Sequence, residues 1–216
     1  MADFGLSEEQ EMLRELAHEF ARDSVRPHAE HWDLENEFPL ETIAEAHALG
    51  LTNLHIPTEY GGMGMGIADE VLVIEEFAWG DPGFSTAAYS NGLTAGPIIT
   101  GGTEEQKEEY LGRLVKEPKI ASYCVTEPAA GSDVASIETT AVRDGDHYIL
   151  NGEKMFITGA GHADWFFVLA YTDKSAGYKG MSAFIVESNL DGVTLGKKES
   201  NMGQRASDTR GVRFDN

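Results

Sequence analysis

The chain has 216 residues, of which 41% are hydrophobic, so it can bury the core of one large or two small domains. Its 37 acidic residues against 16 Lys and Arg give a formal net charge of −21, which excludes nucleic acid as a partner because phosphates would be repelled. No apolar run approaches the ~18 residues that a membrane span requires, and a single cysteine excludes an intramolecular disulfide.

The acidic residues are scattered along predicted helix faces, which favours a solvated surface over a disordered tail. A salt-rich cytoplasm would account for this acidic, lysine-poor surface, because salt screens the self-repulsion; ordinary variation in surface charge is the alternative. The start, Met1-Ala2-Asp3-Phe4, lacks the basic residues and apolar block of a signal or transit peptide. We therefore expect a cytoplasmic protein.

Helical signals fill the chain up to about residue 118. Ser7 followed by Gln10 resembles a capping box, and it predicts a helix from Ser7 to about Val25. Further helices are predicted over 39–49, 67–79, 82–93, 97–101 and 103–115, the third helix burying Val71, Ile74, Phe77 and Ala78. The glycine-rich segment 61–66 lacks the preceding strand of a dinucleotide loop and is interpreted as a turn.

After Pro118 the hydrophobic period changes to two. Candidate strands cover 120–125, 137–143, 147–150, 165–170, 183–186, 193–196 and 212–214. Asp144-Gly145 and Asn151-Gly152 are typical of hairpin turns. We therefore expect an α+β protein, with an all-α domain over 1–118 and a small antiparallel β-barrel or sandwich domain over 119–216.

Two segments of the β half carry hydroxyl groups next to apolar strands. The segment from Tyr123 to Asp133 combines Thr126, Pro128 and a flexible turn through Ser132, and the segment from Lys154 to Gly159 adds Thr158. Donors arranged in this way suit a flat polar ring with an anionic tail.

These segments, together with 151–158 and 201–211, resemble the acyl-CoA dehydrogenase family in order and spacing, and are most similar to its medium-chain type. The resemblance implies an amino-terminal helical domain, a middle β domain and noncovalent FAD in a homotetramer or homodimer. It also implies a carboxy-terminal four-helix domain that this chain does not include. The resemblance covers the whole chain but only about the first half of the family's length, so the chain is expected to be truncated relative to the family.

Site residues follow from the resemblance. It places Thr126 near the pyrimidine edge of the flavin and Thr158 at flavin N5. Phe156, where the family often has Trp, would stack on one flavin face. Gly131 and Ser132 would approach the pyrophosphate and the pantetheine arm. The expected cofactor-binding residues are Tyr123, Cys124, Val125, Thr126, Gly131, Ser132, Phe156, Ile157 and Thr158.

Acyl-CoA is the implied substrate, and its expected binding residues are Ser132, Tyr89, Tyr178 and Lys179. The loop with Tyr178 and Lys179 resembles the segment that meets the adenine end of CoA, although a lysine there could simply be solvated. Tyr89 lies on the helix that floors the acyl pocket in the family. It would either shorten that pocket or pack in the core.

Other charged and polar residues are interpreted as structural. The seven histidines show no metal spacing, so no metal is expected. Cys124 has no basic neighbour in sequence and should pack in its strand. Arg205, Asp208 and Arg210 are expected to brace the β domain as an ion-pair network, with a ligand site as the alternative.

In the family the reaction is α,β-dehydrogenation of an acyl-CoA thioester, with hydride transfer to flavin N5 and electrons passing to an electron-transfer flavoprotein. The family's glutamate base lies in or near the carboxy-terminal helical domain, so no catalytic residue is assigned in this chain, Glu127 included. The isolated chain is expected to bind FAD weakly and to be inactive unless a second polypeptide supplies the base.

Two other functions stay open. An acyl-CoA oxidase or a nitroalkane-oxidase-like flavoenzyme would keep the fold and would consume oxygen. A noncatalytic scaffold is the third alternative, and the retention of Thr126, Ser132 and Thr158 together argues against it.

Overall fold

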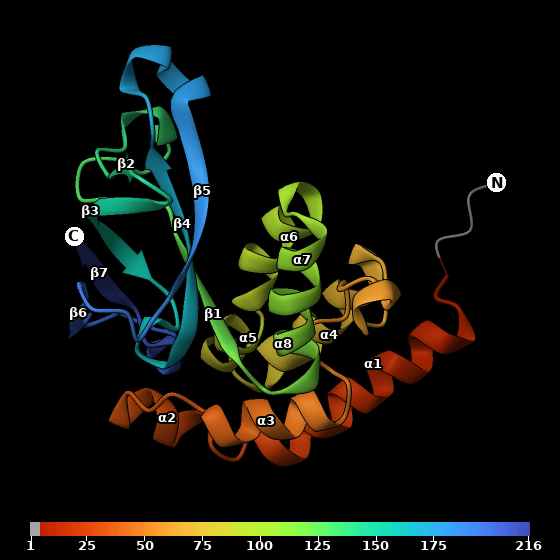
Figure 1. Ribbon diagram of the computed structural model, residues 1–216. Coiled ribbons are helices and arrows are strands. Elements are labelled where there is room, and N and C mark those ends of the chain that lie inside the picture. Colours follow the sequence, from red (N-terminus) through yellow and green to blue (C-terminus); the bar gives the residue numbers. More distant parts are fainter. Residues whose placement is uncertain (1–4) are drawn as a thin grey trace. The chain divides into compact units, whose positions relative to one another are not determined.

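The computed structural model describes residues 5–216, and the chain divides into two compact units. A helical unit comprises residues up to 118 together with 201–207, and a β unit comprises 119–200 and 208–216. In Figure 1 the helices run from red to yellow-green and the strands from green to blue. The α+β fold expected from the sequence is confirmed.

The helical elements differ in detail from those predicted. They are α1 (Glu8–Phe20), η1 (Ala21–Val25), α2 (Ala29–Glu35), α3 (Leu40–Ala48), η2 (Thr58–Tyr60), α4 (Ile67–Gly80), α5 (Pro82–Ala88), α6 (Asn91–Gly101), α7 (Glu104–Gln106), η3 (Lys107–Leu111) and α8 (Gly112–Lys116). Helix α1 continues into the π-helical turn η1, and α7, η3 and α8 follow one another without a gap. Helix α2 was not predicted.

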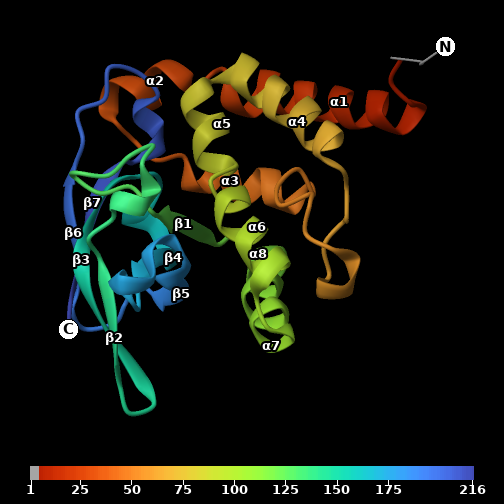
Figure 2. The same cartoon turned by 90° about the horizontal axis from the view of Figure 1, so that it is seen from above.

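The start of α1 confirms the predicted capping box. The hydroxyl of Ser7 accepts a hydrogen bond from the amide of Gln10 at 3.2 Å, and the side chain of Gln10 accepts one from the amide of Ser7 at 3.1 Å. Helix α1 packs against α4 (Figure 2), where the side-chain Nε2 of Gln10 donates to the carboxylate of Asp69 at 2.8 Å. The cap therefore fixes both the beginning of α1 and one contact to its neighbour.

Two predictions in the helical unit were wrong, the first of them only in part. Helix α4 buries Phe77 as predicted, but Val71 is 51% exposed. Ile74 and Ala78 are half-buried, and Val73 and Gly80 complete the buried face. Gly80 belongs to the buried face because a Cβ there would lie 2.9 Å from Val25. The predicted break at Pro97 is absent from the structure, since α6 starts at Asn91 and runs through the proline.

The glycine-rich segment 61–66 is a turn, as predicted. Gly61 and Gly64 have positive φ angles of 86° and 62°, which glycine adopts without strain. Gly66 then forms the N-cap of α4.

The β unit contains seven strands in one mixed sheet, all within the described residues: β1 (Ile120–Cys124), β2 (Thr140–Asp144), β3 (His147–Ile157), β4 (Ala163–Tyr171), β5 (Met181–Glu187), β6 (Val193–Lys198) and β7 (Arg210–Asp215). Their order is β1-β4-β2-β3-β7-β6, and β5 pairs with β4. The pairing of β1 with β4 is parallel, so the sheet is not purely antiparallel as expected.

The two predicted hairpin turns had different outcomes. Asp144 pairs with His147 across a tight turn in which Gly145 has a φ of 61°, and the β2–β3 hairpin projects from the unit in Figure 2. The turn predicted at Asn151-Gly152 is wrong, because both residues lie inside β3 and pair with β7. Strand β3 is consequently long enough to reach from the hairpin to the second hydroxyl-bearing segment.

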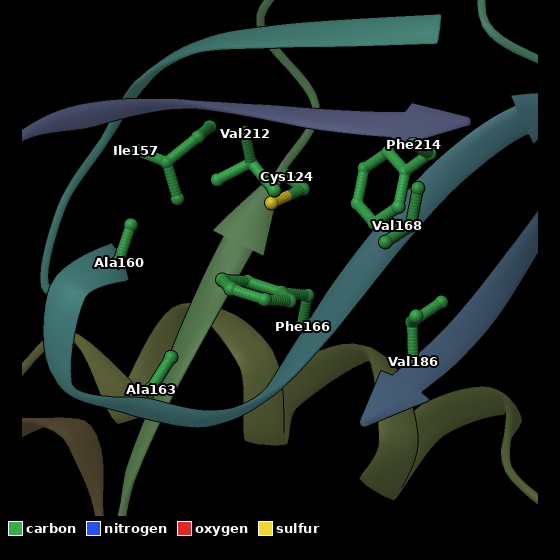
Figure 3. Close-up of a cluster of buried hydrophobic side chains, with 9 residues drawn as sticks. All are labelled: Cys124, Ile157, Ala160, Ala163, Phe166, Val168, Val186, Val212 and Phe214. Atoms are coloured by element: carbon green, nitrogen blue, oxygen red, sulfur yellow. The ribbon is translucent and has the colours of Figure 1, made fainter. Parts of the chain in front are cut away.

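A hydrophobic cluster fills the β unit (Figure 3). It consists of Cys124, Ile157, Ala160, Ala163, Phe166, Val168, Val186, Val212 and Phe214. Because Cys124 and Ile157 belong to this cluster, the two segments singled out in the sequence share one core. Among residues 5–216, no helix has the length and apolar character needed to cross a membrane.

Candidate functional site

Two hydrogen bonds join the hydroxyl-bearing segments in the β unit. The amide of Met155 donates to the carbonyl of Thr126 at 2.8 Å. In the second hydrogen bond, the hydroxyl of Ser122 donates to the carbonyl of Thr158 at 2.7 Å. The structure therefore brings the Tyr123–Thr126 segment and the Phe156–Thr158 segment side by side.

A β-bulge in β3 turns Phe156 outward. Lys154 pairs with Val212 and Ile157 pairs with Arg210, so β3 has one more residue than β7 between these pairs. The extra residue reverses the alternation of side chains, which puts Lys154 and Ile157 inside and leaves Phe156 62% exposed. Phe156 also has a φ of 59°.

A left-handed backbone at a bulky residue is unfavourable by roughly 1–2 kcal/mol. Such strain concentrates at ligand sites, where the fold holds a side chain in an otherwise rare direction. The exposed, strained aromatic ring of Phe156 therefore points to a ligand with a flat face.

Three hydroxyl groups of the two hydroxyl-bearing segments are available to a ligand. Thr126 and Thr158 are half-buried and Ser132 is exposed, and their side chains make no hydrogen bond to any other group within residues 5–216. A Cβ built on Gly131 would meet nothing within 4 Å, so the backbone of the turn is open. An aromatic face, unshared hydroxyls and an open glycine turn fit the ring, polar edges and phosphates of FAD.

The remaining expected cofactor residues have other surroundings. Cys124 and Ile157 point into the core (Figure 3), so only their backbones can meet a ligand. Val125 is buried, and Tyr123 stacks on Phe167 with ring centroids 5.1 Å apart. Burial raises the pKa of the Cys124 thiol, which keeps it protonated and inert, as expected from the sequence.

Sequence reasoning missed the role of Lys154. Its fully buried ammonium lies 2.8 Å from Glu127, whose side chain is 4% exposed. Burial alone would raise the pKa of Glu127, but hydrogen bonds from Lys154 and Thr139 outweigh it and hold the pKa below its ordinary value. The available signal was the alternation of side chains along β3, which puts Lys154 on the same side of the strand as the core residue Leu150. This alternation is interrupted after Lys154 by the bulge, which depends on pairing with β7.

Asp208 anchors the chain just beyond Thr158. Its carboxylate accepts the amide of Gly161 at 2.8 Å and pairs with Arg210 at 2.9 Å, and its carbonyl accepts the amide of Gly159 at 3.1 Å. Burial would raise its pKa, but the hydrogen bonds from Arg210 and Gly161 leave the pKa below its ordinary value.

The expected network of three charged residues exists only in part. Arg205 forms an ion pair with Asp33 at 2.5 Å. Arg205 and the rest of segment 201–207 belong to the helical unit. The segment therefore belongs to a different unit from the one expected for it, because a long-range ion pair and packing against α2 and α5 hold it there.

The expected substrate residues fall in both units. Tyr89 lies in the helical unit, where its hydroxyl donates to the carbonyl of Leu51 at 2.9 Å and its ring meets Phe77 edge-on. Burial raises the pKa of Tyr89. Tyr178 and Lys179 are exposed in η6 (Lys174–Gly180), between β4 and β5. No cluster of three or more metal-ligating side chains occurs in the described part of the chain.

Two family models match the chain. The acyl-CoA dehydrogenase N-terminal domain matches residues 7–118, and the acyl-CoA dehydrogenase middle domain matches residues 122–216. The chain is 46% identical over 215 residues to a probable medium-chain specific acyl-CoA dehydrogenase of Caenorhabditis briggsae, covering 98% of this chain and 53% of that protein. It thus spans about half the length of the curated relatives it matches.

Solved structures of similar fold include acyl-CoA dehydrogenases. Butyryl-CoA dehydrogenase of Megasphaera elsdenii is 38% identical with a TM-score of 0.93, covering 99% of this chain and 57% of that one. A glutaryl-CoA dehydrogenase of Mycobacterium smegmatis, in complex with FADH2, is 32% identical with a TM-score of 0.88, covering 98% and 53%. A chain in a structure of the electron-transferring flavoprotein of Acidaminococcus fermentans is 39% identical with a TM-score of 0.95, covering 99% and 57%.

Proposed function

The chain belongs to the acyl-CoA dehydrogenase family, and on that premise we propose that it supplies FAD-binding and acyl-CoA-binding residues for α,β-dehydrogenation of acyl-CoA thioesters. Homologous structures contain the flavin. Bound FAD supplies the hydride-accepting chemistry.

One observation carries this proposal. The hydrogen bond between Met155 and Thr126 brings two unshared hydroxyls next to an exposed aromatic ring on a strained bulge. A purely structural sheet has no need to hold Phe156 outward at a cost in backbone strain.

Each residue has a definite task in the proposed site. The hydroxyl of Thr158 would donate to or accept from the flavin at N5, and the hydroxyl of Thr126 would stabilise negative charge at its pyrimidine edge. Phe156 covers one face of the ring and excludes water from it. Gly131 and Ser132 receive the phosphates and the pantetheine arm.

Glu127, the carboxylate next to Thr126 in sequence, is unsuited to remove the substrate's α proton. Glu127 accepts hydrogen bonds from Lys154 at 2.8 Å and from the amide of Thr139 at 3.0 Å, so it is buried and engaged. We accordingly assign no base within these residues, and propose that the chain alone does not turn over acyl-CoA.

The proposed partners follow from the family. Acyl-CoA is the substrate, with Tyr89, Ser132, Tyr178 and Lys179 as its contacts, and an electron-transferring flavoprotein is the electron acceptor; the match to a chain in such a structure supports this. A homotetramer or homodimer in the cytoplasm is the proposed setting.

Titration of FAD with the purified chain, followed by flavin fluorescence, tests the proposal. We expect saturable but weak quenching, which Phe156→Ala and Thr158→Val weaken further because they remove the stacking face and a hydroxyl. Tyr148→Ala and Thr194→Val are the controls, because they change an exposed aromatic in β3 and an exposed threonine in β6.

Two results would count against the proposal. Quenching that is absent at the highest soluble protein concentration would remove the flavin role of this chain. Turnover of an acyl-CoA by the chain that disappears in Glu127→Gln would show that Glu127 is the base and that the chain is active alone.

A further inference from the structure

The most unusual group in the β unit is the ammonium of Lys154, which has no solvent exposure. It donates to the carbonyl of Val125 at 3.2 Å, to the carbonyl of Leu169 at 2.7 Å and to the carboxylate of Glu127 at 2.8 Å. An ammonium group has three N–H donors, so every donor has an acceptor. The buried charge is fully satisfied.

Stability alone is a poor reason for such a group. A buried ion pair loses the hydration of both charges, and replacing it with well-packed apolar residues is often neutral or stabilising. The best-attested use of buried polar groups is to specify one arrangement of the chain among several. The question is then which arrangement Lys154 specifies.

Its three acceptors come from two separate parts of the chain. Val125 and Glu127 follow β1, Leu169 lies in β4, and Lys154 itself belongs to β3. The next residue along β3, Met155, donates its amide to Thr126, which lies between the two acceptors that follow β1. Lys154 therefore joins the backbones on both sides of the proposed flavin site.

Glu127 is itself held from the other side. Its carboxylate accepts the amides of Glu138 at 2.5 Å and Thr139 at 3.0 Å, besides the hydroxyl of Thr139. It also forms a two-hydrogen-bond bridge with Ala130 through its backbone, which closes the turn ahead of Gly131 and Ser132. If the carboxylate moved, it would lose these hydrogen bonds. Its position is therefore fixed, and it fixes the position of the Lys154 ammonium that donates to it.

We propose that Lys154 is a positioning residue that holds Thr126 in register with Phe156 and Thr158. The role rests on the proposed flavin function, but its structural part can be measured without flavin. Loss of the ammonium frees the segment after β1 from β3, and the hydrogen bond from Met155 to Thr126 then opens more often.

Two variants test the proposal. Lys154→Met keeps the length of an unbranched apolar chain and removes the charge. Lys154→Met combined with Glu127→Gln also removes the carboxylate that would otherwise stay buried without its partner. Lys119→Met is the matched control, because Lys119 pairs with Asp164 at 2.9 Å in the same unit but on its surface.

The first measurement is amide hydrogen exchange on the flavin-free chain. We expect exchange at Met155 to accelerate at least tenfold in both Lys154 variants, with the β4–β5 amides, such as that of Val168, changing less. The second is FAD affinity, which should fall at least fivefold in both variants and stay unchanged in Lys119→Met.

Unchanged exchange at Met155 in the folded double variant overturns the proposal. Equal acceleration at Met155 and Val168 does so as well, because it would mean general destabilisation. Failure of both variants to fold would show a role in folding and not in positioning. The proposed function and the positioning role can fail separately. If exchange at Met155 accelerates in the Lys154 variants but the wild-type chain binds no FAD, the proposed function fails while the positioning role stands.

Discussion

The amide nitrogen of Met155 lies 2.8 Å from the carbonyl oxygen of Thr126, and this bond joins two segments that are about thirty residues apart in sequence. It lies at a β-bulge, where the regular pairing of β3 with β7 shifts. Met155 lies between the pairs Lys154–Val212 and Ile157–Arg210, so the bond ties the segment after β1 to β3 at the bulge.

Substitutions at Phe156 should reveal the strain of the bulge. With a φ of 59°, glycine is the favoured small residue, so Phe156→Gly should be about 1 kcal/mol more stable than Phe156→Ala. At Tyr148, in regular strand, the order should reverse, with Ala the more stable by ~0.5–1 kcal/mol. Urea denaturation of the four variants measures both differences. Equal stability of the two Phe156 variants would mean that the backbone there is unstrained.

Two glycines of the β unit should respond oppositely to alanine. A Cβ on Gly152 would collide with the backbone and side chain of Thr139, so Gly152→Ala should lose about 1–3 kcal/mol of unfolding free energy. Gly131→Ala has open space and should stay within ~0.5 kcal/mol of the wild type. It should nevertheless weaken FAD binding if a phosphate approaches that backbone. Thermal unfolding and flavin titration separate the two effects.

Acid should remove the contribution of Asp208. Its pKa is lowered in the folded chain, so its stabilisation is present above the ordinary pKa and is lost as the pH falls through the lower folded value. Asp208→Asn should lose about 1–3 kcal/mol at pH 7, and this difference from the wild type should shrink below pH ~4. Urea unfolding between pH 3 and 7 checks it.

The control for this experiment is Asp215→Asn, which breaks an exposed pair with Arg213. It should change stability by less than ~1 kcal/mol at every pH. A difference for Asp208→Asn that stayed constant with pH would contradict the assigned ionisation.

Salt should stabilise the whole chain. At a formal net charge of −21 the surface charges repel one another, and 1 M salt shortens the screening length from about 10 Å at 0.1 M to about 3 Å. We expect the melting temperature to rise steeply between 0.1 and 1 M KCl. Sucrose at equal osmolarity should reproduce only a small part of the rise. A flat response to KCl would leave ordinary surface variation as the reason for the charge.

Local signals were predictable from the sequence wherever the determining atoms are close in the chain. The Ser7–Gln10 capping box and the glycine turn before α4 depend on groups within a few residues. The change in the spacing of hydrophobic residues near residue 118 also marked the change from helices to strands. It could not show that segment 201–207 packs with the helices.

Errors occurred where distant chain segments decide the outcome. Asn151-Gly152 has the composition of a turn, but pairing with Asp215 and Phe214 extends β3 through it. The parallel pairing of β1 with β4 likewise depends on the path of the chain between them.

By itself, the sequence determined the two-part α+β organisation and the family, because cap residues, hydrophobic periods and the order of the motifs are properties of neighbouring residues. Only the tertiary structure decided that Phe156 faces outward while Lys154 is buried against Glu127. The physical reason is the register of β3 against β7: one extra residue exchanges inside for outside, and that register is set by a strand more than fifty residues away.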